Sequence, residues 1–206
     1  MAKKLLSQNK RPLINVDWSC TSKKKDWHIL RASVVVRGRS QTIYQEVYPQ
    51  KLSNSPRAQN QFLKNLRILI PQDVKPIIVT DAGFRCPWFK SVIQLGWDYV
   101  GRIRNKSLYQ MKTGGTWGYT YDLYTYANNK AKAIGPAFLA RKMKLECFFV
   151  LYKKAKRNRK NMNASGKETN NNRSNRCARN AREPWLLATS IQVQNNIEAK
   201  KIVKFY

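Results

Sequence analysis

Histidine is almost absent from this 206-residue chain, and its few cysteines are widely spaced. His28 is the only histidine, and no Cys-x-x-Cys pair occurs among the four cysteines, which are Cys20, Cys86, Cys147 and Cys177. This pattern argues against zinc centres and against histidine-based acid–base catalysis. We expect the cysteines to be reduced and structural. A metal site in this chain would need oxygen ligands, which favours Mg²⁺ or Mn²⁺.

Long apolar runs are also lacking. No stretch approaches the roughly 18 apolar residues that a membrane-spanning helix needs. The first six residues, Met1 to Leu6, lead into polar positions rather than into the apolar centre of a secretory signal. We therefore expect a cytoplasmic protein without a membrane partner.

Acidic residues are scarce relative to basic ones. The chain has 11 Asp and Glu against 40 Lys and Arg, a formal net charge of +29. Counterion release makes such a balance favourable on a nucleic-acid backbone. An acidic membrane surface would attract the same charge, but no basic amphipathic helix stands out. Nucleic acid is therefore the expected partner, and a hydrophobic content of 42% still allows a packed core.

Apolar and β-branched residues outline strands and helices in the first half of the chain. Three β-rich runs are expected to form an antiparallel meander, followed by an amphipathic helix, a strand buried on both faces, a second helix and a further strand. The expected bounds are 11–19, 27–36 and 41–48 for the meander, 56–70 for the first helix, 75–80 for the buried strand, 87–95 for the second helix and 97–103 for the last strand. This order predicts a mixed α/β fold.

The second half changes in character. Tyr and Gly are frequent up to an apolar strand at 145–152, which indicates a mostly β region. The next thirty residues are of low complexity, with basic residues throughout and Glu168 as the one acid, so we expect a flexible loop. A strand at 184–190 and the opening of a helix at 195–206 complete the chain. The expected divisions are a first part of the core at 11–104, a β-rich insertion at 105–152, a basic flexible loop at 153–182 and a return to the core at 183–206.

Two aspartates each close an apolar, strand-like run. Asp17 follows Leu13 to Val16, and Asp81 follows Ile77 to Thr80. A carboxylate at the end of a buried strand is costly to desolvate unless a cation pairs with it, and a divalent ion is a natural candidate. The two aspartates would form a metal site if their strands lie side by side. From the residues alone, an ordinary polar turn at each aspartate remains an alternative.

Several long segments carry a family resemblance. They are Pro76 to Arg85 (PIIVTDAGFR), Pro87-Trp88-Phe89, Leu95 to Arg104 (LGWDYVGRIR) and Glu183 to Ser190 (EPWLLATS). In this order they resemble the bacterial DDE transposases of the insertion-sequence-four family, and the resemblance extends from Arg11 to Tyr206. It implies an RNase H-like core, that is, a mixed sheet with flanking helices, interrupted by a β-rich insertion before the last catalytic helix.

The resemblance also implies an activity, which is DNA transposition. Three carboxylates of the family hold two Mg²⁺ or Mn²⁺ ions that serve to cut transposon ends and join them to target DNA. Asp17 resembles the first carboxylate and Asp81 the second. Tyr206 resembles the tyrosine that opens the family signature of Tyr, two residues, Arg, three residues, Glu, whose arginine and glutamate would follow Tyr206. Neither Glu183 nor Glu198 has the spacing to replace that glutamate, so we expect a fragment truncated at both ends and inactive alone.

Further residues are candidates for DNA contact. The resemblance places Trp185, on the strand before Tyr206, where a tryptophan stacks on a base flipped out of the DNA end, although a core tryptophan is an equally good interpretation. Arg102 and Arg104 should share one face of a strand, as contacts with phosphates or as solvated side chains. Arg85 could orient a phosphate or pair with an acid, and Tyr206 is a further candidate. The resemblance implies that the intact enzyme binds transposon ends and target DNA at the bacterial nucleoid, as a homo-oligomer on the DNA.

Two other functions remain open from the sequence. One is a non-catalytic basic nucleic-acid-binding protein in which the paired aspartates are structural. The other is a stand-alone RNase H-like nuclease that works with two carboxylates. Metal binding at Asp17 and Asp81 separates the first of these from the transposase interpretation, and metal-dependent nicking by the chain alone would favour the second.

Overall fold

An antiparallel meander forms one end of the sheet, as the sequence predicts. The computed structural model describes residues 6, 9–21, 26–36, 38–104, 106–155, 165–168 and 183–206. The meander consists of β1 (Leu13–Cys20), β2 (Trp27–Val36) and β3 (Arg39–Pro49), which pair in this order with a register shift between Ala32 and Ser33. Asp17 closes the apolar run of β1 but not the strand, because β1 continues through Trp18 to Cys20.

Two parallel strands follow the meander in the sheet. β4 (Ile77–Thr80) pairs in parallel with β1 on one side and with β5 (Asp98–Ile103) on the other. All four residues of β4 are buried, as expected for a strand covered on both faces. The parallel strands are joined through helices, which is the usual way to reverse the chain between them.

The helices begin and end close to the predicted positions. The short η1 (Gln50–Leu52) leads to α2 (Pro56–Leu69), in which the Ser55 hydroxyl oxygen accepts a hydrogen bond from the Ala58 amide at 3.2 Å. α3 (Cys86–Gln94) connects β4 to β5. α5 (Asn196–Phe205) follows Asn195, whose side chain accepts from the amides of Ile197 and Glu198 at 3.0 Å each. The predicted element ends differ from these bounds by one or two residues.

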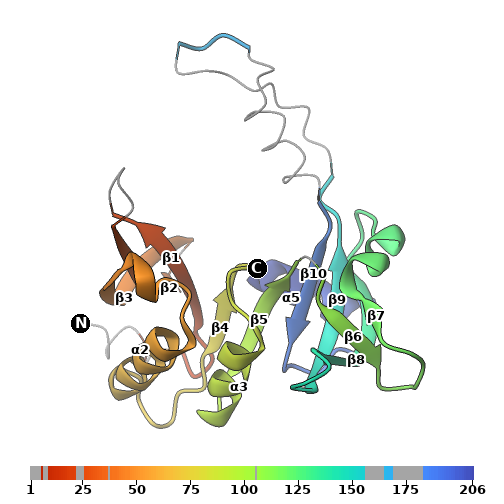
Figure 1. Cartoon of the computed structure of the whole chain (residues 1–206), viewed down its shortest axis with the longest axis horizontal. Coiled ribbons are helices and arrows are strands. Elements are labelled where there is room, and N and C mark those ends of the chain that lie inside the picture. The colour runs from red at the N-terminus through yellow and green to blue at the C-terminus, as the bar shows by residue number, and fades with distance from the viewer. Residues whose placement is uncertain are drawn as a thin grey trace.

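The rest of the chain extends the same sheet. β6 (Leu108–Met111), β7 (Gly118–Tyr119), η2 (Thr120–Tyr126), β8 (Lys132–Leu139), β9 (Leu145–Tyr152) and β10 (Trp185–Thr189) complete the described elements. The strand order is β3-β2-β1-β4-β5-β10-β9-β8-β6-β7 (Figure 1). β10 is antiparallel to both β5 and β9. It therefore joins the strands of the first half of the chain to those of the second half in one sheet.

Helices cover both faces of this sheet (Figure 1). α2 and α3 lie on one face, where Phe62, Leu66, Trp88 and Phe89 are at most 1% exposed. α5 lies on the other face, where its Ile202 and Ala199 pack with residues such as Val79, Val100 and Leu187. This mixed α/β sheet with flanking helices is the architecture that the sequence predicts for an RNase H-like core.

One glycine lets α3 approach the sheet closely. A Cβ atom at Gly101 of β5 would stand 2.3 Å from Cζ of Phe89, well inside van der Waals contact. The Phe89 ring stacks on Tyr99 with a centroid distance of 4.4 Å and an interplanar angle of 16°. Glycine is therefore required here by packing, since both aromatic rings are completely buried.

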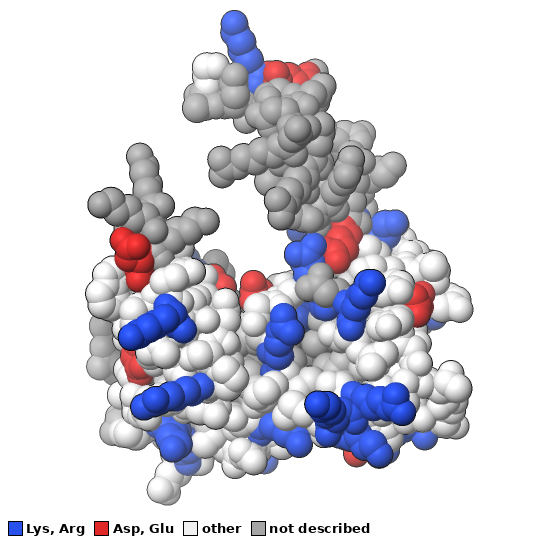
Figure 2. Space-filling model, viewed as in Figure 1, with Lys and Arg blue, Asp and Glu red and all other residues white. Residues whose placement is uncertain are grey.

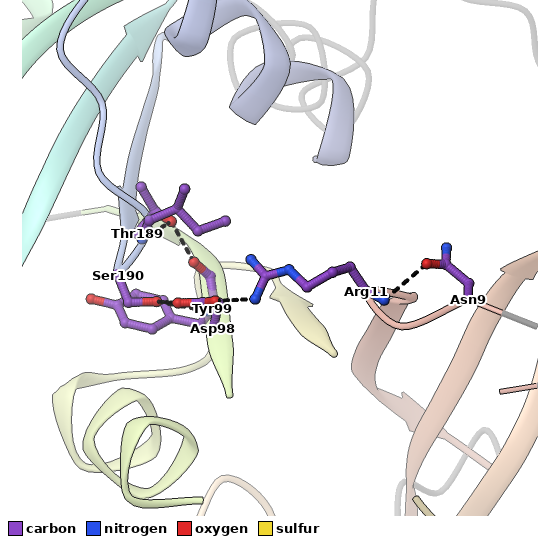
Figure 3. A network of polar contacts seen from close by, with 7 residues as sticks. Asn9, Arg11, Asp98, Tyr99, Thr189 and Ser190 are labelled. Carbon is purple, nitrogen blue, oxygen red and sulfur yellow. Dashed lines mark hydrogen bonds and ion pairs between the residues drawn. The ribbon is translucent and has the colours of Figure 1, made fainter. Parts of the chain in front are cut away.

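A polar network links β1, β5 and β10 where β5 begins (Figure 3). Arg11 donates from Nη1 to Oδ2 of Asp98 at 2.6 Å, and the Ser190 hydroxyl donates to the other oxygen of Asp98 at 2.7 Å. The Thr189 hydroxyl donates to the carbonyl of Tyr99 at 2.6 Å. These contacts fix the ends of three strands that are distant in sequence, at the edge of the sheet away from Asp81.

Two further expectations concern the basic loop and the absence of a membrane-spanning helix. The basic loop expected at 153–182 lies outside the described residues except for 153–155 and 165–168. Among the helices that the structure describes, none has the length and apolar character to cross a membrane.

Candidate metal and DNA-binding site

The sheet brings Asp17 and Asp81 together. In the parallel pair of β1 and β4, Val16 stands opposite Thr80, and each aspartate is the next residue along its chain. Asp17 lies on the same face of β1 as Leu13, since alternate residues of a strand share a face, and Leu13 packs against the apolar cluster under α5. The condition on which the sequence-based metal site depended, two neighbouring strands, is thus met.

The electrostatics of Asp17 reflect this proximity. Burial of its carboxylate by the surrounding protein raises the pKa of Asp17, and the negative charge of Asp81 raises it further. A backbone hydrogen bond at Trp18 and the charge of Arg31, its neighbour on β2, act in the opposite direction. Two carboxylates brought together by neighbouring strands form a donor set suited to a hard divalent cation.

A backbone contact orients Asp81. The amide of Gly83 donates to Oδ1 of Asp81 at 2.8 Å, and a Cβ atom on residue 83 would stand 3.0 Å from the same oxygen. Glycine at this position leaves room for the carboxylate to fold back onto the chain. The side chain is therefore held at the edge of the sheet before any ligand binds.

No third acid joins the pair in the part of the chain that the structure describes. There, no cluster of three His, Cys, Asp or Glu side chains could hold a metal ion. Glu198 instead accepts from the Gln194 amide at 2.7 Å, as part of the start of α5. Glu183 forms ion pairs with arginines, described below.

Arg102 and Arg104 share a face and a partner. Both donate from Nη2 to Oε2 of Glu183, Arg102 at 3.3 Å and Arg104 in a closer contact. Their side chains are only 14% and 30% exposed. The shared face is as predicted, but the alternative of solvated side chains is wrong. Residues 102 and 183 meet because β5 and β10 pair, with Ile103 opposite Leu186.

Trp185 and Tyr206 are in contact beside these arginines. Their rings meet edge to face with centroids 4.9 Å apart. Trp185 also packs on Tyr152, its partner on β9, and the Lys154 ammonium lies 5.5 Å from its ring centroid. Trp185 is half-buried, so the side chain combines core packing with an accessible edge.

Tyr206 connects this aromatic pair to the carboxylates. Burial raises the pKa of Tyr206, whereas the charge of Arg102 and a hydrogen bond with it lower the pKa, and the charge of Asp81 raises it. The phenol oxygen therefore lies within electrostatic reach of both the arginine and the candidate metal ligand. The end of α5 approaches the carboxylates, as it must if this helix is to serve the site.

A cleft of about 380 Å³ opens next to Asp81. Basic side chains form much of its polar wall, and Phe84, Leu108, Leu139 and Met143 contribute to the apolar wall; the basic residues are Arg85, Arg102, Arg104 and Lys106. No acidic side chain lines it. The cleft lies in a molecule whose Lys and Arg side chains outnumber the acids over the face shown in Figure 2. Arg85, whose role was open, lines this cleft.

Several residues of this region escaped the sequence-based prediction. Strand pairing, which short-range patterns do not reveal, brings Arg31 next to Asp17 and Glu183 next to the arginines. Tyr124 reaches Ile103 from η2, and Lys106, two residues after Arg104, lines the cleft. Gly83 could have been found, because a glycine two residues after a candidate ligand commonly allows the side chain to accept from the backbone.

A known protein family matches most of the sequence. The family described as Transposase DDE domain matches residues 8–206. No curated protein matches the sequence. The matched range includes both aspartates, the basic cleft and the whole of the described sheet, whose mixed α/β form fits an RNase H-like fold. The chain therefore belongs to the DDE transposase family, whose role is in DNA transposition.

Proposed function

We propose that the chain is part of the catalytic core of a transposase of the insertion-sequence-four type. Asp17 and Asp81 would hold Mg²⁺ or Mn²⁺ at the sheet edge. The observation that supports this most strongly is the parallel register of β1 and β4, which sets the two carboxylates side by side. The charge of Asp81 is the second cause, after burial, of the raised pKa of Asp17, which supports the proximity of the two carboxylates.

The surrounding residues would serve the DNA. Bound divalent ions supply activation of water and then of a 3′-hydroxyl for attack on a phosphodiester. In this proposal Asp17 and Asp81 orient the ions, and Arg85, Arg102 and Arg104 bind phosphates along the cleft. The half-buried rings of Trp185 and Tyr206 would stack on a base at the DNA end.

We further propose that the reaction needs a third carboxylate besides Asp17 and Asp81. Among the described residues no other acid joins these two, so we expect them to bind metal without completing the reaction. We also propose that 11–104 is the first part of the core, 105–152 the β-rich insertion and 183–206 the return to the core.

A plasmid assay tests this function. Purified protein is incubated with supercoiled DNA and Mg²⁺ or Mn²⁺, and both mobility shift and nicking are followed on gels. We expect a shift without nicking. Nicking that disappears in Asp17→Asn and Asp81→Asn would contradict inactivity and favour a stand-alone nuclease. Absence of any shift by the folded protein would contradict DNA as the partner.

A further inference from the structure

Glu183 lies between two arginines that would otherwise repel each other. Its Oε2 accepts from Nη2 of both Arg102 and Arg104, and its side chain is only 22% exposed. The hydrogen bond with Glu183 is the largest cause that raises the pKa of Arg104. Two guanidinium groups at such short range in a partly buried setting are unfavourable unless an anion bridges them. The shared carboxylate therefore allows the two cations to converge.

Glu183 contacts the two arginines but is not part of the cleft wall. Arg102 and Arg104 both line the cleft, whereas Glu183 is not among its lining residues. A carboxylate inside the cleft would compete with phosphate for the arginines. A guanidinium carries five N–H groups, so each arginine can contact Glu183 through Nη2 and a phosphate in the cleft at the same time.

Neighbouring contacts hold Glu183 in place. The Tyr124 hydroxyl donates to the Ile103 carbonyl at 3.3 Å, between the two arginines. Burial raises the pKa of Tyr124, and the charge of Glu183 raises it further, so the hydroxyl and the carboxylate are close. Two residues later, Trp185 begins β10 and is paired with Tyr152. The carboxylate is thus attached to a rigid strand.

We propose that Glu183 is a positioning residue that holds Arg102 and Arg104 together as one fork for a single DNA phosphate next to Asp81. The inference rests on the proposed function, since it takes the phosphate to belong to the DNA that Asp17 and Asp81 serve. The role of Glu183 is indirect: it orders the donors, and the arginines touch the ligand. Bidentate and paired guanidinium contacts of this kind are strong and geometrically selective for phosphate.

The direction in which one substitution changes the DNA affinity separates this positioning role from a simple charge effect. Glu183→Gln removes one negative charge from the protein, so an effect of charge alone predicts tighter DNA binding. Positioning predicts weaker binding, because the arginines separate once the bridging anion is lost. We expect roughly tenfold weaker binding of a short fluorescein-labelled duplex, measured by fluorescence anisotropy.

Two further readouts test the fork itself. The slope of log affinity against log salt should fall by about 0.9 in Glu183→Gln, corresponding to one lost phosphate contact. In an Arg104→Ala background, Glu183→Gln should have no additional effect, since the fork is already broken. If Glu183 had only a structural role, Glu183→Gln would lower thermal stability without changing the DNA affinity or its salt dependence.

Matched variants complete the experiment. Glu146→Gln makes the same charge change at a carboxylate that pairs with Lys112 and is 54% exposed, outside the cleft. It should bind at least as tightly as wild type. Glu183→Asp keeps the charge and should retain an intermediate affinity, and it replaces Glu183→Gln if circular dichroism shows that Glu183→Gln fails to fold.

The outcomes distinguish this inference from the proposed function. If wild type binds DNA and Glu183→Gln binds as tightly as Glu146→Gln, the positioning role is wrong and the proposed function stands. If Glu183→Asp takes the place of Glu183→Gln and binds like wild type, the positioning role is wrong in the same way. If folded wild type binds no duplex, the proposed function itself is wrong.

Discussion

Asp17 and Asp81 are electrostatically coupled across the parallel pair of β1 and β4. After burial, the charge of Asp81 is the next largest cause that raises the pKa of Asp17. The coupling arises because Val16 and Thr80, the residues before them, are directly paired. The sheet thus assembles a pair of acids in a chain with a formal net charge of +29, at the point where a basic cleft begins.

The contact of Gly83 with Asp81 predicts a change in metal affinity. In Gly83→Ala the new methyl group would crowd Oδ1 of Asp81, 3.0 Å away, and turn the carboxylate out of its present orientation. We expect about tenfold weaker Mn²⁺ binding, as is usual when a residue that orients a ligand is altered. Isothermal titration calorimetry measures this. Gly118→Ala, where the nearest atom lies at an ordinary 3.4 Å, should leave affinity unchanged.

The close approach of α3 to β5 predicts a loss of stability in Gly101→Ala. The added methyl group would overlap the Phe89 ring, which is buried and stacked on Tyr99. Overpacking of a core typically costs about 1–3 kcal/mol, so the urea midpoint should fall accordingly. Gly118→Ala again serves as the control. A Gly101→Ala protein as stable as wild type would show that α3 does not lie where we describe it.

The cysteines should differ in reactivity. Burial raises the pKa of Cys86 to about 11, and Cys147 is also buried, whereas Cys20 is exposed. Since the thiolate is the reactive form, iodoacetamide at pH 8 should modify Cys20 in the native protein and spare Cys86 and Cys147. A Cys177→Ser background removes the fourth thiol. Mass spectrometry of tryptic peptides reports the sites, and modification of Cys86 at the rate of Cys20 would contradict the described core.

Local sequence patterns predicted most of the elements but not their long-range pairings. The run Ile77 to Thr80 identified β4, because a strand covered on both faces is apolar throughout. Asp17 was correctly placed within a strand expected at 11–19, and the structure bounds this strand at Leu13–Cys20. Past Val16 the strand has exposed and half-buried residues, so the apolar run ends before the strand does.

In the candidate site, too, local patterns were predicted and long-range contacts were not. The two aspartates could be proposed from sequence because each follows an apolar run. The pairing of Arg102 with Glu183 could not, since 81 positions separate them and only the insertion of β10 between β5 and β9 brings them together. Whether these residues act on DNA remains a prediction.

The most direct test of the account is Mn²⁺ binding, followed by electron paramagnetic resonance of the free ion. Wild type should bind Mn²⁺, and Asp17→Asn combined with Asp81→Asn should abolish that binding without unfolding the protein. Asp73→Asn, which alters an exposed carboxylate that pairs with Lys10, should bind like wild type. Equal Mn²⁺ binding by wild type and by the Asp17→Asn, Asp81→Asn protein, or none by folded wild type, would contradict the claim that these two aspartates form the metal site.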